Sequence, residues 1–69
     1  MAVTTFEMDS DSAAPTLAGS ALIPFARRWS ASWNDIDARH TLLRVEHPAE
    51  DAGLVVERVL GADPNVHLV

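Results

Sequence analysis

Apolar and polar residues alternate over residues 40–46, a pattern typical of a β-strand. Thr41, Leu43 and Val45 fall on one side of such a strand, and Leu42, Arg44 and Glu46 fall on the other. The first side is mostly apolar and the second mostly polar. We therefore expect one face of this strand to pack on helices and the other to remain partly solvated.

A helix is predicted to begin near Pro48, because proline fits the first turn, where its missing N–H costs nothing. Glu50 and Asp51 favour the positive end of the helix dipole. Gly61 and then Pro64 are typical of a helix end. The stripe predicted to be buried consists of Ala52, Val55, Val56, Val59 and Leu60.

A second short strand is predicted over residues 66–69, so residues 41–69 form a strand–helix–strand unit. The two strands of such a unit run parallel. Two parallel strands alone leave two open edges, and isolated two-stranded sheets are marginal. We therefore expect at least one further strand, supplied by a second copy or by another protein.

The segment before this unit, residues 20–36, is predicted to be an amphipathic helix. Phe25, Trp29, Trp33 and Ile36 recur at spacings of four, four and three, which places them on one helical face. This face either packs on the sheet or anchors a partner, since Trp and Arg are enriched in binding hot spots. The predicted partner-binding residues are Phe25, Arg28, Trp29, Trp33 and Leu68.

Residues 1–19 are predicted to be a flexible acidic tail, because Asp9 to Pro15 is a small, polar tract. Phe6 and Met8 are the large apolar side chains that could anchor this tail on a partner. The predicted fold is thus a small α/β (α+β) protein. Its tail precedes one small domain over residues 20–69, completed by oligomerisation or by a partner.

Size and charge narrow the classes of function. The chain has 69 residues, no cysteine and no lysine, and its net charge is -5. A chain this short is marginal without a disulfide, a metal or an oligomeric contact, and disulfides are excluded here. The acidic balance disfavours nucleic acid, whose binding rests on neutralising phosphates. Without a secretory signal or a membrane-length apolar run, we expect a cytoplasmic protein with no membrane partner.

The ionisable residues predict no catalytic, cofactor-binding or metal site. His40 and His47 lie about 23 Å apart if the strand between them is extended, and His67 could approach one of them only. A metal ion needs three or four ligands. Glu50 and Asp51 diverge around their helix by about 100°. The three glycines do not form a phosphate-binding loop.

One stretch resembles a known family. It comprises Leu42–Val45, Ala52–Leu60 and Asp63–Val69. This succession of strand, valine-rich helix, acidic turn and strand is similar to the start of the coupling (effector) proteins of multicomponent diiron monooxygenases. The resemblance implies a small cofactor-free regulatory subunit that docks on a hydroxylase. It covers about 28 residues. The family continues through further elements and usually has D-N-P at the turn, where Ala62-Asp63-Pro64-Asn65 stands here.

Three hypotheses follow. The first is a small acidic accessory subunit without catalytic activity, which regulates a larger protein such as an oxygenase-type complex. The second is a homodimeric module that completes its own sheet. The third is a subunit that carries residues of an enzyme site only within the assembly, with His40, His47 and His67 as the first candidates.

Overall fold

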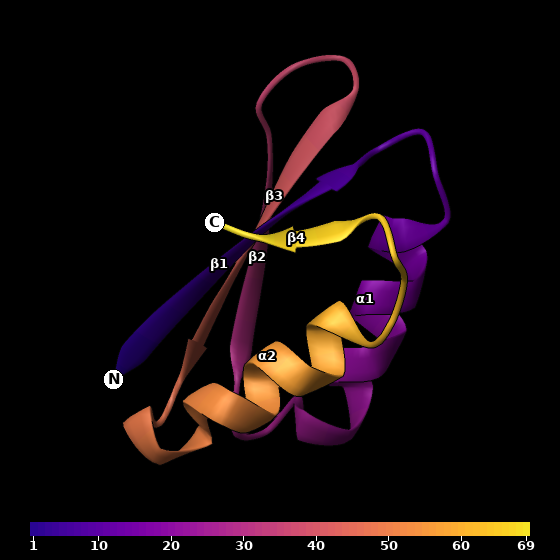
Figure 1. The fold of residues 1–69 in the computed structure, drawn as a ribbon. Coiled ribbons are helices and arrows are strands. Elements are labelled where there is room, and N and C mark those ends of the chain that lie inside the picture. The colour runs from indigo at the N-terminus through magenta and orange to yellow at the C-terminus, as the bar shows by residue number, and fades with distance from the viewer.

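The structure, a computed structural model, describes all residues from Met1 to Val69. Four strands, two α-helices and two short 3₁₀ helices follow one another along the chain (Figure 1). In chain order they are β1 (Ala2–Asp9), α1 (Ala14–Leu22), η1 (Ile23–Phe25), β2 (Ser30–Asp35), β3 (His40–His47), η2 (Ala49–Asp51), α2 (Ala52–Leu60) and β4 (Val66–Leu68).

The four strands form one sheet in the order β2-β3-β1-β4, and every neighbouring pair is antiparallel. The central pair, β1 and β3, is matched over its full length, from Ala2 opposite His47 to Asp9 opposite His40. The βαββαβ sequence of elements with this strand order is the split βαβ arrangement of ferredoxin-like folds. The chain is therefore a small α+β protein with two layers.

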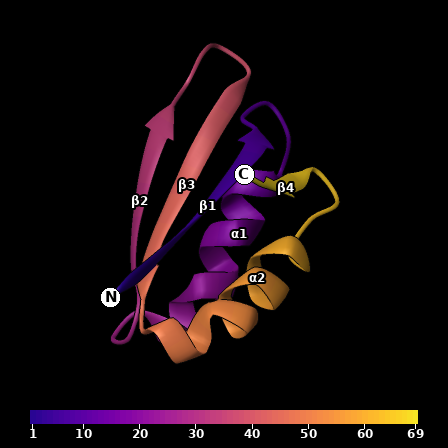
Figure 2. The same cartoon turned by 60° about the vertical axis from the view of Figure 1, so that its left-hand side comes forward.

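Both helices cover the same face of the sheet, and the other face is left open (Figure 2). The core lies between the two layers. Phe6, Met8, Leu43 and Val45 come from the sheet and are fully or almost fully buried. The helices contribute Ala14, Ala18 and Leu22 from α1 and Val55 and Val59 from α2.

The predicted flexible tail is wrong, because residues 2–9 form the central strand β1. Phe6 and Met8 are core residues rather than anchors for a partner. Val3, Thr4 and Thr5 are β-branched and favour a strand. The acidic tract after them is only the turn between β1 and α1, in which the Asp9 carboxylate accepts the Asp11 N–H at 2.9 Å.

The predicted helix over residues 20–36 is also wrong. Helix α1 begins earlier, at Ala14, and ends at Leu22, and residues 30–35 form the strand β2. The buried stripe of α1 consists of Ala14, Ala18 and Leu22, which are spaced four apart. A spacing of four keeps residues on one side of a strand as well as of a helix. The Trp29–Trp33 spacing therefore could not distinguish the two.

The predicted strand at residues 40–46 and the strand near the C-terminus are confirmed as β3 and β4. Thr41, Leu43 and Val45 are buried on the helix side, as predicted. The second helix is confirmed as α2, preceded by the 3₁₀ turn η2. Val55 and Val59 are buried and Val56 and Leu60 partly so, whereas Ala52 is exposed, which corrects the predicted stripe.

The two strands flanking α2 run in the same direction, since both are antiparallel to β1. They are not neighbours, however, because β1 lies between them. The strand missing from the predicted strand–helix–strand unit is thus supplied by residues 2–9 of the same chain. None of the helices is both long and apolar enough to cross a membrane.

Candidate protein-binding groove

Strand β2 forms an outer edge of the sheet, with β3 on one side and no strand on the other (Figure 2). All six of its residues, Ser-Ala-Ser-Trp-Asn-Asp, are exposed. Edge strands usually carry lysine, proline or a bulge, or are very short, to prevent pairing with other chains. The opposite edge, β4, is only three residues long. β2 has neither proline nor lysine, and its single charge, Asp35, lies at its end.

A groove of about 400 Å³ lies beside this edge, on the helix side of the sheet. Its walls come from the end of α1, from η1 and the turn after it, and from β2. Six of its eight lining residues are hydrophobic. The lining residues are Gly19, Leu22, Ile23, Ala26, Trp29, Ser30, Ala31 and Trp33.

Trp33 forms part of the β2 wall of the groove. It pairs across the sheet with the buried Leu43, so its side chain lies on the helix side. A Cβ atom at Gly19 would lie 3.7 Å from the Cζ2 atom of Trp33, an ordinary van der Waals distance, so the ring lies beside α1 at this position. The Trp33 side chain nevertheless remains 42% exposed, and Ile23 remains 70% exposed. The groove therefore presents apolar surface directly beside an unpaired strand.

The end of the groove nearest Trp29 is fixed to α2 by a buried carboxylate. Trp29 Nε1 donates to Asp51 Oδ2 at 2.9 Å, and Arg28 donates to the same oxygen from Nη2 at 2.7 Å and from Nε at 3.1 Å. The Trp29 hydrogen bond and then the Arg28 hydrogen bond and charge hold the pKa of Asp51 below its ordinary value. These three contacts tie the segment that leads into β2 to the start of α2.

An aromatic stack supports the same group of contacts among Arg28, Trp29 and Asp51, which we call the Asp51 corner. The rings of Phe25 and Trp29 are nearly parallel, with their centroids 4.1 Å apart. The Arg58 guanidinium lies 5.3 Å from the Phe25 centroid, within the range of a cation–π contact. Phe25 is only partly buried and packs against the core cluster. The stack helps to hold the turn between η1 and β2 in place.

The structure divides the predicted partner-binding residues into three groups. Phe25, Arg28 and Trp29 meet at the Asp51 corner, where Trp29 is 5% exposed and serves the core. Trp33 lines the groove at the β2 edge. Leu68 is half exposed on β4, the opposite edge of the sheet.

Sequence reasoning missed the role of Asp51. The sequence indicates only a helix-dipole contact for Asp51, but its carboxylate is the acceptor that joins residues far apart in sequence. An indole N–H that becomes buried needs an acceptor, and this need is the signal that could have found it.

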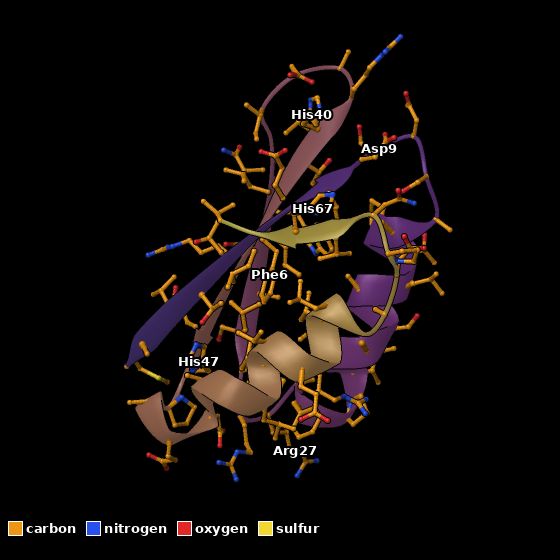
Figure 3. The ribbon with its side chains drawn as sticks, in the orientation of Figure 1. Phe6, Asp9, Arg27, His40, His47 and His67 are labelled. Atoms are coloured by element: carbon orange, nitrogen blue, oxygen red, sulfur yellow. The ribbon has the colours of Figure 1, made fainter.

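The three histidines lie in different surroundings (Figure 3). His47 is fully buried, with Nε2 2.7 Å from Thr4 Oγ1 and Nδ1 2.8 Å from the Pro48 carbonyl oxygen. Because a carbonyl oxygen only accepts, Nδ1 must carry the hydrogen. His40 lies at the other end of β3, and His67 lies opposite Glu7 on the open face of the sheet.

His40 and His67 share a small polar cleft of about 230 Å³ with Glu7, Met8, Asp9 and Asn65. His40 Nδ1 lies 3.0 Å from the Asp37 carboxylate, and this hydrogen bond raises the pKa of His40 above its ordinary value of 6.5. The backbone N–H of Arg39 and then His40 lower the pKa of Asp37. The chain has no group of three or more His, Cys, Asp or Glu side chains placed to hold a metal ion.

Comparison with known proteins gave no match: no family model, curated protein or solved structure matches this chain.

Proposed function

We propose that this protein is an accessory domain that binds an extended segment of another protein along β2. The segment would add a fifth strand to the sheet. Its backbone would use the unpaired N–H and C=O groups of Ser30–Asp35, and an apolar side chain would enter the groove beside Trp33. In this mode of recognition, main-chain hydrogen bonds supply affinity and the pocket supplies specificity.

The observation that carries this proposal is the position of the groove next to the unprotected edge. Either feature alone is common, since small proteins have edge strands and exposed apolar residues. Here an edge free of proline and lysine runs along one wall of the groove, and Trp33 belongs to both. The Asp51 contacts hold the Trp29 end of this wall in place, so the site is preformed.

The buried ionisable groups have structural roles in this proposal. Asp51 is used by Arg28 and Trp29, and His47 by Thr4 and the Pro48 carbonyl. The proposal therefore assigns the chain a binding function without a catalytic step. The resemblance of residues 42–69 to coupling proteins of diiron monooxygenases remains a prediction. On that view the bound segment would belong to an oxygenase component.

A peptide selection tests the proposal whatever the identity of the partner. A random peptide library would be selected against dilute immobilised protein, with an Ala31→Lys variant as the matched target. Ala31 is exposed and lines the groove, so lysine there places a charge on the edge and in the apolar site. Asn65→Lys makes the same charge change in the exposed turn before β4.

We expect peptides with apolar residues at alternate positions to be enriched on the wild-type protein and on Asn65→Lys, and lost on Ala31→Lys. Equal enrichment on all three targets would contradict the proposal, because binding would then not depend on the β2 edge. Absence of any enriched peptide on folded wild-type protein would contradict it as well.

A further inference from the structure

Charges flank the β2 edge unequally and restrict what can pair with it. Arg27 and Arg28 precede the strand, and Asp35 and Asp37 end or follow it. Arg27 is exposed and projects from the lower end of the molecule (Figure 3). A strand that pairs antiparallel to β2 is therefore favoured if acidic residues follow its C-terminal end, because that end lies beside Arg27. It should also carry a basic group before its N-terminal end, where it meets Asp37.

Side-chain size adds a second restriction. On the helix side of β2, the large Trp33 and the small Ala31 are two positions apart. Directly opposed side chains of antiparallel strands point to the same face. The matching strand should therefore present a small residue opposite Trp33 and a large one opposite Ala31.

The β2 segment of this chain itself meets both requirements. Resting on the proposed strand-addition function, we infer that a second copy of the chain occupies the edge when no partner strand is bound, paired antiparallel about a twofold axis at Ser32. Ala31 then faces Trp33 of the second copy, and Ser30 faces its Asn34. The same register brings Arg27 towards Asp37 of the second copy. The two sheets become one continuous sheet of eight strands.

Neighbouring registers fit less well. A shift that places Trp33 on the axis sets two indole rings opposite each other and sets Ala31 opposite Asp35. An intermediate register would set Ser32 opposite Trp33. These side chains lie on different faces of the sheet, whereas directly opposed residues of antiparallel strands must share a face, so this register is not possible. Of these three registers, the Ser32 register satisfies faces, sizes and end charges together.

The net charge of each copy, -5, opposes association at long range. At physiological ionic strength the Debye length is about 8 Å, so this repulsion is screened while close pairs at the strand ends persist. The dimer is consequently a concentration-dependent species that a better-matched partner strand can displace. The inferred dimer and the proposed partner strand thus compete for the same β2 edge.

Single-cysteine cross-linking tests the register, and the natural chain contains no cysteine to interfere. In the Ser32 register, the two Ser32 Cα atoms are directly opposed, at about 4.5–5.5 Å, which lies within disulfide range. A Ser32→Cys variant exposed to oxidised glutathione should form a disulfide-linked dimer. Ser30→Cys is the matched control on the same face, and its two sites would be about 13 Å apart along the strands.

We expect rapid covalent dimer formation for Ser32→Cys and at least tenfold slower formation for Ser30→Cys, with unmodified protein sedimenting as a concentration-dependent dimer. Equal cross-linking of both variants, or a wild-type protein that stays monomeric at all concentrations, would overturn the second-copy inference. Strand addition itself would survive that failure if the peptide selection still depended on Ala31. Loss of both results would refute the two proposals together.

Discussion

Trp29 Nε1 lies 2.9 Å from Asp51 Oδ2, and this hydrogen bond joins the segment before β2 to the start of α2. Arg28 donates to the same carboxylate oxygen at 2.7 Å. Both members of the Trp29–Asp51 pair are buried, with exposures of 5% and 8%. The edge strand that we propose as a binding site thus begins directly after a fixed point of the fold.

Replacing Asp51 with Asn should lower the melting temperature by several degrees, measured by circular dichroism. The neutral amide oxygen can occupy the place of Oδ2, but it is a weaker acceptor and carries no charge to pair with Arg28, so the hydrogen bonds from Trp29 and Arg28 both weaken. Glu50→Gln is the matched control, because Glu50 is exposed on the same turn. Equal effects of the two variants would show that the corner contributes no more than an ordinary surface charge.

The Asp51 contribution should depend on pH in a defined direction. The pKa of Asp51 is lowered in the folded state by Trp29 and Arg28, whereas the pKa of an aspartate in an unfolded chain is about 3.9. Its stabilising effect is therefore fully present above about pH 4 and is lost as pH falls through the lower folded pKa. The stability difference between wild type and Asp51→Asn should be constant from neutral pH to about pH 5 and shrink in stronger acid. A difference that grows in acid would contradict this assignment.

His40 should titrate above its ordinary range because Asp37 accepts from its ring, which raises the His40 pKa. Because the pKa of His40 is higher in the folded than in the unfolded state, protonated His40 stabilises the fold below about pH 6.5. This stabilisation disappears as pH rises through the pKa of His40 in the folded state. Proton NMR of the His40 ring should show a midpoint above 6.5 that moves down in Asp37→Asn. Glu57→Gln, on α2, should leave the midpoint unchanged. An unchanged midpoint in Asp37→Asn would refute the pair.

Phe6→Ala should remove a large part of the free energy of unfolding. Phe6 is fully buried at the centre of the sheet, and truncating such a residue costs about 3–5 kcal/mol. A chain of this size has a total stability of about 3–10 kcal/mol. Urea denaturation should show this loss, whereas Val3→Ala, on the exposed side of the same strand, should cost a small fraction of it. A loss for Phe6→Ala as small as that for Val3→Ala would revive the flexible-tail interpretation.

The sequence predicted the second half of the fold well because its signals were local. The alternation at Thr41, Leu43 and Val45 and the stripe of Val55 and Val59 do not depend on any other segment. It also predicted that the strands around α2 needed another strand. The source of that strand was missed, because β1 pairs with residues 31–45 positions away, from Asp9 opposite His40 to Ala2 opposite His47, and no local pattern encodes so distant a pairing.

The predicted helix over residues 20–36 was wrong because a spacing of four residues fits both a helix and a strand. Phe25, Trp29 and Trp33 satisfy a helix, but the chain turns at η1 and places Trp33 on a strand. Of the candidate partner-binding residues, Trp33 lies at the groove, while Trp29 belongs largely to the core. The groove itself depends on α1, β2 and Gly19 meeting in space, and no local pattern encodes that meeting.

Amide hydrogen exchange on the chain, with and without a peptide selected on the wild-type protein, tests the central claim most directly. If the peptide adds as a strand to β2, exchange should slow within Ser30–Asp35 and remain unchanged in β4, from Val66 to Leu68. Ala31→Lys should show no such slowing at the same peptide concentration. Protection confined to β4 or to α2, with the amides of β2 unaffected, would contradict the assignment of β2 as the binding edge.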